Sequence, residues 1–335
     1  MKNQKFGIEI ELTGLTREKA AKVVANYFNS HSDRVGNGYD IYEIVDDQSR
    51  RWKVMNDASI CAEKKVTGEY ISAEDVYRVE LVSPICTYDD IPKIQEIVRL
   101  LRKSGAIANN STGIHIHIDA SNHNPNTLRT LTNIIRSKED ILYKALQVGE
   151  GRAYDYCRKV NDGFIDRINR RKPRTLQQLN DIWYNGRDGS SQHYHSSRYH
   201  ALNLHSVFQK GTVEFRLFNG TTHAGKIKSY IQLALAISHQ ALTQRYASPS
   251  RTQSENEKYT FRTWLLRLGL IGDEFKTARQ HLLANLEGNI AWKDPTQANR
   301  TQVNVSVTES SDDIVTSDIN HDEDEIEEYD MSMTM

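Results

Sequence analysis

The sequence predicts an α+β fold in which a curved, mostly antiparallel sheet packs against helices. One observation is the recurrence of short segments that alternate apolar and polar residues, which is typical of strands with one buried face. Another is that longer segments with apolar residues at helical spacing separate these strands without a regular β/α repeat. A parallel sheet would need such a repeat, so we expect neighbouring strands to run in opposite directions.

Three of the predicted strands carry ionisable side chains on one face. They read FGIEIEL at 6–12, GIHIHID at 113–119 and TVEFRLF at 212–218. Because successive strand side chains point to opposite faces, the two ionisable residues of each strand leave it on the same side. These residues are Glu9, Glu11, His115, His117, Glu214 and Arg216. A sheet that gathers them would hold acids, imidazoles and a guanidinium on one face.

Capping signals predict the helices between these strands. A threonine or asparagine precedes two of them, and a pair of aspartates precedes the third. The expected helices run from Thr16 to about Asn29, from Asp89-Asp90 through Lys103 with an end at Gly105, and from Asn124-Pro125 to about Gln147.

The remaining segments follow the same reasoning. We expect strands within 39–56 and over 77–83, helices over 150–185 with a break at Lys172-Pro173, a loop at 186–200, strands at 201–208 and 211–218, a helix over about 225–246, and two short helices within 259–287.

The ionisable groups favour one kind of chemistry. Carboxylates combined with imidazole bind Mg²⁺ or Mn²⁺, and Glu80 adds a fourth carboxylate on another predicted strand. The three widely spaced cysteines form no thiolate set, so a structural zinc site is not expected. An arginine beside such metals suits phosphoryl transfer, in which charge on the moving phosphoryl group must be neutralised.

Six motifs together resemble a known family, the amidoligases, which are carboxylate–amine ligases similar to glutamine synthetase and γ-glutamylcysteine synthetase. The motifs are FGIEIEL at 6–12, WKV-x-x-DASI at 52–60, VELVSPI at 79–85, TGIHIHI at 112–118, RYHALNL at 198–204 and TVEFRLFNGT at 212–221. The resemblance covers roughly residues 5 to 240. It implies a glutamine synthetase-like catalytic fold.

The resemblance also implies a role for each residue. Glu11 and Glu80 would hold one metal, with Glu69 or Asp57 as a third carboxylate between which the sequence does not choose. Glu9, His115 and Glu214 would hold the metal that bridges the ATP phosphates. The catalytic and cofactor-binding residues implied are His117, Arg216 and Arg198, with Asn203 as a further cofactor- or substrate-orienting residue.

The implied activity is ATP-dependent ligation of a small-molecule or peptide carboxylate to an amine through an acyl phosphate, with ATP and Mg²⁺ or Mn²⁺ as cofactors. Residues 1–247 would form the amidoligase-like catalytic domain, 248–258 a linker, 259–299 a helical extension and 300–335 an acidic disordered tail. After Arg300 the sequence holds eleven acids and no Lys or Arg, which leaves residues 1–300 with a formal charge of +10. Such a basic body favours an anionic ligand.

Targeting signals are missing from the sequence. There is no signal-peptide apolar core and no apolar run long enough to span a bilayer, so we expect a cytoplasmic protein without a membrane partner. The cysteines Cys61, Cys86 and Cys157 suit a reducing compartment. Oligomeric state is left open.

Two other functions remain open. A metal-dependent hydrolase built on His115 and His117 would need further ligands on a parallel β/α barrel. A non-catalytic nucleic-acid-binding protein would use the basic body, and its cluster of bases is Arg167, Arg170, Arg171, Lys172 and Arg174. An exposed helix end explains that cluster equally well, and we favour a protein without a nucleic-acid partner. The loop histidines His193, His195, His200 and His205 suggest either ligands or a lid that covers the substrate.

Overall fold

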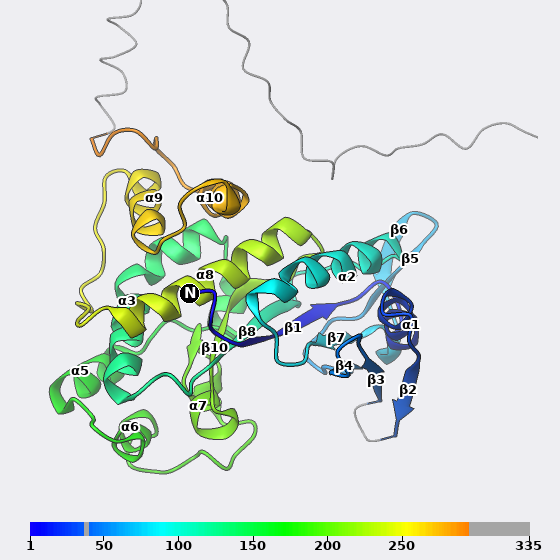
Figure 1. Ribbon diagram of the computed structural model, residues 1–335, viewed down its shortest axis with the longest axis horizontal. Coiled ribbons are helices and arrows are strands. Elements are labelled where there is room, and N and C mark those ends of the chain that lie inside the picture. Colours follow the sequence, from blue (N-terminus) through cyan, green and yellow to red (C-terminus); the bar gives the residue numbers. More distant parts are fainter. Residues whose placement is uncertain (37–39, 295–335) are drawn as a thin grey trace, which may run out of the picture.

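The computed structural model describes residues 1–36 and 40–294, and Figure 1 shows its arrangement. The predicted acidic tail at 300–335, and residues 295–299 of the predicted extension, lie outside the described residues. Within them the main sheet has eight strands in the order β2-β3-β4-β7-β1-β8-β10-β9. Their bounds are β1 (Phe6–Leu12), β2 (Ser32–Val35), β3 (Ile41–Val45), β4 (Arg51–Met55), β7 (Val79–Val82), β8 (Gly113–Asp119), β9 (Leu202–Asn203) and β10 (Thr212–Asn219).

Every pairing between neighbouring strands of this sheet is antiparallel in the described part of the chain. A separate antiparallel hairpin is formed by β5 (Glu63–Val66) and β6 (Glu69–Ser72). The predicted α+β class with a mostly antiparallel sheet is therefore confirmed.

Ten α-helices and four short 3-10 helices accompany the strands within the described ranges. The α-helices are α1 (Arg17–Tyr27), α2 (Ile91–Lys103), α3 (Pro125–Ala145), α4 (Glu150–Asp155), α5 (Asp162–Arg171), α6 (Leu176–Trp183), α7 (His205–Lys210), α8 (Ala224–Thr243), α9 (Glu257–Arg267) and α10 (Lys276–Leu283). The 3-10 helices are η1 (Asp75–Tyr77), η2 (Tyr88–Asp90), η3 (Ser196–Arg198) and η4 (Asp273–Phe275).

The predicted helix starts are confirmed by their caps. The hydroxyl of Thr16 accepts a hydrogen bond from the Lys19 N–H, and Asn124 does the same for Asn126 and Thr127 ahead of α3. Gly105 follows α2 with a φ of +103°, a left-handed conformation that glycine adopts without strain.

The strand predicted at 201–208 is wrong beyond Asn203. Its alternating letters suit a strand, but the Asn203 side-chain carbonyl accepts a hydrogen bond from the His205 N–H and turns the chain. Only Leu202–Asn203 pairs with β10, and α7 follows until Gly211 ends it with a φ of +69°. Local side-chain bonding thus overrides the periodic pattern.

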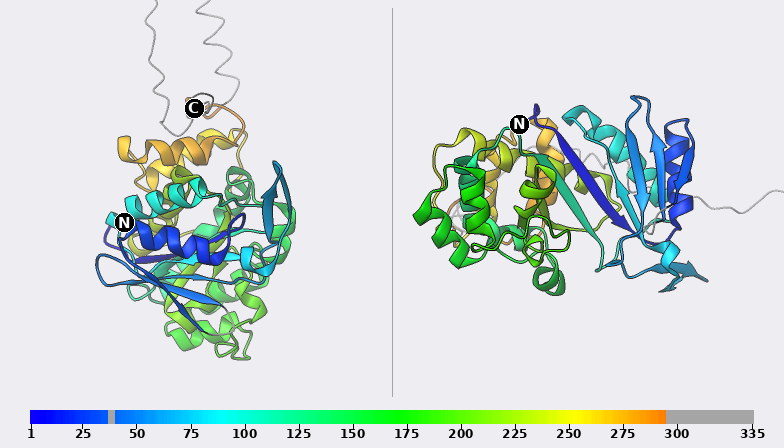
Figure 2. Two further views of the ribbon diagram at one scale, coloured as in Figure 1. Left: turned by 90° about the vertical axis from the view of Figure 1, so that its right-hand side faces the viewer. Right: turned by 90° about the horizontal axis from the view of Figure 1, so that it is seen from below.

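The core lies between the sheet and α8. Along β1 the side chains of Ile8, Ile10 and Leu12 are buried on the face opposite the glutamates. Helix α8 is buried around most of its circumference because it contacts β8 on one side and α2, α3 and α10 on others. In Figures 1 and 2, α9 and α10 lie on the side of α8 that faces away from the sheet. Strands β2, β3 and β4, together with α1, lie at the opposite end of the molecule from α5 and α6.

The segment between α8 and α9 is tied to α3. The Thr252 N–H bonds to the carbonyl of Ser137, and Arg251 pairs with Asp140. The proposed division into catalytic domain, linker and extension stays a prediction. None of the helices in the described ranges has both the length and the apolar character needed to span a lipid bilayer.

A buried ion cluster joins the loop after β3 to the start of α2. The Arg50 guanidinium donates to Asp46 and to both carboxylate oxygens of Asp90, and the Trp52 indole N–H also donates to Asp46. Burial works to raise the pKa of Asp46, but hydrogen bonds from the backbone of Arg50 and Gln48 and from the guanidinium outweigh it and lower that pKa.

We expect Arg50→Ala to lower the free energy of unfolding by about 3 kcal/mol, because two buried carboxylates would lose their counter-charge. Arg51→Ala is the matched control, since this neighbouring side chain is 66% exposed and pairs with Glu43 at the surface. We expect it to cost about 0–1 kcal/mol. Urea unfolding of both variants makes the comparison. Equal losses would contradict a structural role for the buried cluster.

Candidate metal centre

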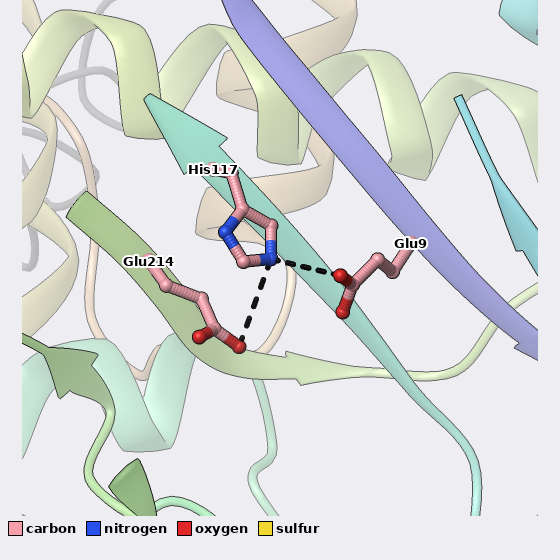
Figure 3. A group of neighbouring side chains, drawn as sticks. All are labelled: Glu9, His117 and Glu214. Atoms are coloured by element: carbon pink, nitrogen blue, oxygen red, sulfur yellow. Dashed lines mark ion pairs between the residues drawn. The ribbon is translucent and has the colours of Figure 1, made fainter. Parts of the chain in front are cut away.

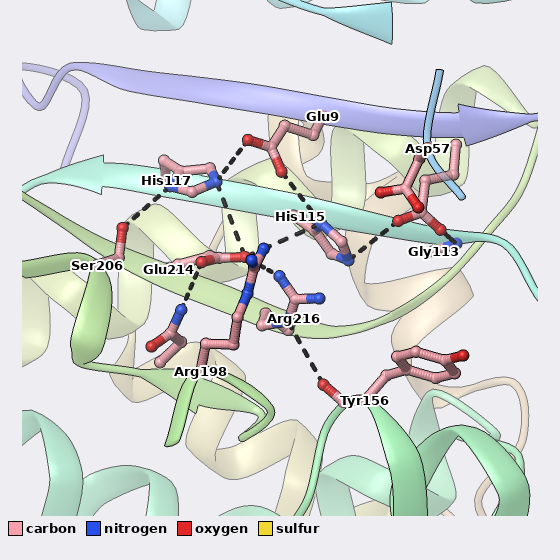
Figure 4. A network of polar contacts seen from close by, with 12 residues as sticks. Glu9, Asp57, Gly113, His115, His117, Tyr156, Arg198, Ser206, Glu214 and Arg216 are labelled. Atoms are coloured by element: carbon pink, nitrogen blue, oxygen red, sulfur yellow. Dashed lines mark hydrogen bonds and ion pairs between the residues drawn. The ribbon is translucent and has the colours of Figure 1, made fainter. Parts of the chain in front are cut away.

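Strand register brings the ionisable residues together. The central strand β1 lies between β7 and β8, and β8 lies between β1 and β10. Residues directly opposite one another share a face of the sheet. The opposed pairs are Glu9 with His115, Glu11 with Glu80, and His117 with Glu214. Figure 4 shows Glu9, His115, His117 and Glu214 converging on one face of β1, β8 and β10.

The first group consists of Glu9, His117 and Glu214 (Figure 3). The His117 Nε2 atom lies 3.2 Å from a Glu9 oxygen and 3.9 Å from a Glu214 oxygen. It is buried and has no hydrogen-bond partner, whereas Nδ1 lies 3.1 Å from the Thr212 hydroxyl. In the tautomer that donates its Nδ1 proton to Thr212, Nε2 would direct a lone pair between two carboxylates. That is the arrangement a metal ligand needs.

His115 occupies the middle of the site. Its Nδ1 lies 3.2 Å from Glu9 and 3.9 Å from Glu214, and its Nε2 lies 3.5 Å from Glu11. Burial, assisted by the charge of Arg216, lowers the pKa of His115 to about 4. The imidazole is therefore neutral at physiological pH and can donate a lone pair. With Glu9 and Glu80 it forms a second group of potential ligands.

The third group is made only of carboxylates, those of Glu11, Asp57 and Glu80, whose nearest oxygens lie within 4.8 Å of one another. Burial and the charge of Asp57 raise the pKa of Glu11 to about 7, although Arg152 and Arg216 oppose this shift. Burial raises the pKa of Glu80 well above its usual range, and the charges of Glu9, Asp57 and Glu11 add to the effect. Neighbouring carboxylates repel one another when ionised, and a divalent cation bound between them would remove that repulsion.

Asp57 and Glu69 were the two candidates for a third carboxylate beside Glu11 and Glu80. Asp57 lies in the loop after β4 and joins them, while Glu69 is exposed on the β5–β6 hairpin. The geometry favours Asp57.

Three arginines, Arg216, Arg198 and Arg152, lie near these acids. The Arg216 guanidinium donates to Glu214. Burial works to raise the pKa of Glu214, but the Arg216 charge, with smaller contributions from the nearby His117 and His115 rings, lowers it to about 2. Arg198 packs its guanidinium beside the rings of Tyr194 and Tyr199 and donates to the carbonyl of His193. In the described part of the chain Arg198 makes no ion pair with a carboxylate, so its charge is available to an anion.

Arg152 is a site residue that the sequence reasoning missed. It is 7% exposed, donates to the carbonyl of Arg216 and counters the charge of Glu11. A Cβ at Gly113 would lie 2.1 Å from the Arg152 guanidinium, so any other residue here would displace that guanidinium from its present position. The glycine before the two histidines was a signal of close approach, but it did not identify the approaching residue.

A β-bulge in β10 places Phe218 on the face opposite Arg216. Phe215 lies opposite Ile116, but Phe218 lies opposite Ile114, so three steps along β10 match two along β8. The bulge lets Glu214 and Arg216 face the site while both phenylalanines stay buried on the other face. Phe218 stacks there on Tyr230 of α8, with ring centroids 4.6 Å apart.

Asn203 lies behind the site. Its amide N–H donates to Glu214 at 2.6 Å, and its carbonyl is taken by the His205 N–H. Both ends are engaged within the protein, which favours a role in holding Glu214.

The loop histidines separate into two sets. His193 is exposed and lines an open hollow of about 490 Å³ together with Lys210, whose ammonium lies 3.4 Å from Glu9. His195 and His205 stack on each other beside Tyr184, and His200 contacts Trp183. Of the four, only His193 lies in the wall of this hollow. Lys210 lies in no motif that marked it as a site residue in the sequence.

Buried carboxylates, imidazoles and guanidinium groups on one sheet face define a candidate metal centre. A family described as "Putative amidoligase enzyme" matches residues 2–238, and the chain belongs to this family. The matched segment contains all eight strands of the main sheet.

A solved structure also matches, a bifunctional glutathione synthetase from Pasteurella multocida, with a TM-score of 0.39 and 11% sequence identity. The match covers 91% of this chain and 49% of that one, so the chain spans about half the length of this neighbour. A likeness of this size carries no argument about activity. A search of curated proteins finds no match.

We expect Mg²⁺ or Mn²⁺ to raise the melting temperature of the protein, and Glu80→Gln to abolish this increase. In EDTA the variant should melt no lower than the wild type, since an amide avoids the repulsion that raises the Glu80 pKa. Glu43→Gln, on β3 away from the site, is the control and should keep the metal-dependent increase. Differential scanning calorimetry with and without metal measures the melting temperature of each protein. A Glu80→Gln protein with the full increase would contradict the assignment.

Proposed function

We propose that the protein is an ATP-dependent carboxylate–amine ligase whose chemistry takes place on the site face of β7, β1, β8 and β10. The observation that carries the proposal is the convergence of three overlapping ligand groups beside available arginine charge. Membership of the amidoligase family supports the reaction class. ATP and the metals belong to the proposal.

The donor set fits hard divalent cations, because it combines carboxylates with neutral imidazole and includes the unpaired, buried Nε2 of His117. Glu11, Asp57 and Glu80 would hold one ion, and Glu9 with Glu214 and an imidazole would hold another. His117 and His115 both lie within reach of that pair, although the family resemblance implied His115. Such ions would neutralise phosphate charge when bound.

The arginines have separate tasks in this proposal. Arg216 is buried against Glu214, so it holds that carboxylate ionised and in place. Arg198 has no carboxylate partner within the described residues and is therefore suited to contact the transferred phosphoryl group. Lys210 and His193 line the hollow that adjoins Glu9, which offers space for an anionic substrate at the edge of the site.

The proposed reaction has two steps. A substrate carboxylate oxygen attacks the γ-phosphorus of ATP, the bond to the β-phosphate oxygen breaks, and an acyl phosphate and ADP result. An amine then attacks the acyl carbon, loses a proton and expels phosphate to leave an amide. Exclusion of water from the acyl phosphate would protect the intermediate from hydrolysis.

The hydrolase alternative loses its structural basis. It called for the parallel β/α barrel in which histidine pairs of this kind occur, whereas the main sheet is open and its strand pairs are antiparallel throughout the described ranges. Arg170, Arg171 and Lys172 are exposed at the end of α5, so an exposed helix end explains this basic cluster without a nucleic-acid partner.

We expect phosphate release from ATP with Mg²⁺ to depend on a carboxylic acid from a panel of amino acids, γ-glutamyl compounds and muropeptide-like acids. Hydroxylamine should trap the acyl phosphate as a hydroxamate, because it replaces the amine. Glu214→Gln should abolish both signals. Hydroxamate formation without nucleotide would contradict the proposal, as would full activity of Glu214→Gln.

We expect Arg198→Gln to lower kcat/KM for ATP-dependent turnover about 100-fold, since one charge that stabilises the transferred phosphoryl group is lost. Arg187→Gln is the control, because Arg187 is exposed in the same loop region and lies outside the site. Its kcat/KM should stay within about twofold of the wild type. Equal effects of the two substitutions would remove Arg198 from the catalytic set.

A further inference from the structure

A second cavity lies apart from the metal centre. It has a volume of about 280 Å³ and is bounded by α3, α5, α6, η3 and β9. None of the side chains assigned to the metal centre lines it. The two places share η3 and β9. Arg198 of η3 and Asn203 of β9 belong to the metal centre, whereas Ser196 and Ser197 of η3 and Leu202 of β9 line the cavity.

Aromatic and aliphatic side chains form much of the cavity wall. The rings of Phe164 and Trp183 meet edge to face, with centroids 4.9 Å apart, and Leu202 and Leu204 are buried beside them. The Trp183 indole N–H already donates to the Ser197 hydroxyl at 2.9 Å. The tryptophan therefore offers its ring to an occupant as apolar surface.

The charged groups of the cavity wall are both arginines, and no acid lines it. Arg158 donates to the carbonyls of Tyr199 and Ser196 and so holds η3 in place. Arg167 makes no ion pair or hydrogen bond with any of the residues that the structure describes, and its Nε is buried without a partner. A buried donor of this kind is costly unless an acceptor satisfies it.

We propose that this cavity binds a small amphipathic carboxylate, whose apolar body packs on Phe164 and Trp183 and whose carboxylate accepts hydrogen bonds from Arg167. A planar carboxylate matches the fork of a guanidinium. The volume lies just below the range of drug-sized pockets, which favours a ligand of roughly ten non-hydrogen atoms. This site is independent of the ligase proposal and would exist if that proposal failed.

Isothermal titration calorimetry with phenylacetate in EDTA tests the proposal, and phenylacetamide serves as the uncharged probe of the same shape. We expect phenylacetate to bind the wild-type protein with a Kd on the order of 1 mM or below. The amide should bind at least about tenfold more weakly, because it lacks the charge-assisted bonds to Arg167.

Arg167→Gln should weaken phenylacetate binding by at least about tenfold, and Arg167→Lys should retain part of it. Arg170→Gln, an exposed position on the same helix, is the matched control and should change the Kd by less than about twofold. Circular dichroism checks the fold of each variant, and the comparison of acid with amide needs no variant.

Three results would overturn the proposal. The acid and the amide could bind equally well, or phenylacetate could show no binding up to about 20 mM. Binding that occurs only with Mg²⁺ present would place the acid in the metal centre.

Discussion

The register of four antiparallel strands is the constraint on which the site depends. Because Glu9 lies opposite His115 and Glu11 opposite Glu80, each strand contributes to a neighbour's ligand set. A slip of one residue would exchange the two faces of a strand and bury a glutamate against α8. Ile10 and Ile116, each 0% exposed, hold the other face in place. The packing of the core therefore also sets the geometry of the metal centre.

Charge in the site is distributed unevenly. Glu9 and Glu214 lie near imidazoles and cations that lower their pKa, while Glu11 and Glu80 lie among other acids and have raised pKa values. A buried group of acids opposes folding until a cation compensates it. Stability must then come from elsewhere, above all from the apolar packing around α8 and from the Arg50 cluster. Such a division is common where function demands an unfavourable local arrangement.

Much of this arrangement could be predicted from the sequence. Alternation along 6–12, 113–119 and 212–218 predicted the strands and the shared face of their ionisable residues, because strand periodicity is a local property. Capping residues such as Thr16 and Asn124 located helix starts for the same reason.

What could not be predicted depends on contacts between distant segments. Arg152 lies on a short helix without a motif, and only the tertiary fold brings it onto Gly113. The sequence left Asp57 and Glu69 open as the third carboxylate. Only the fold shows that Asp57 lies beside Glu11 and Glu80 while Glu69 is exposed. The exception is local: at Asn203 a side-chain hydrogen bond to the His205 N–H turns the chain where the letters resemble a regular strand.

The bulge in β10 has a consequence for how relatives of this chain are compared. Phe218 lies on the face opposite Glu214 and Arg216 only because an extra residue lies between the positions that pair with Ile116 and Ile114. A homologue that lacked one residue between 215 and 218 would retain most of the recognisable letters of the motif. Its guanidinium and its aromatic ring could not both reach their proper sides of the sheet. A comparison of relatives therefore has to include the number of residues between 215 and 218 as well as the letters of the motif.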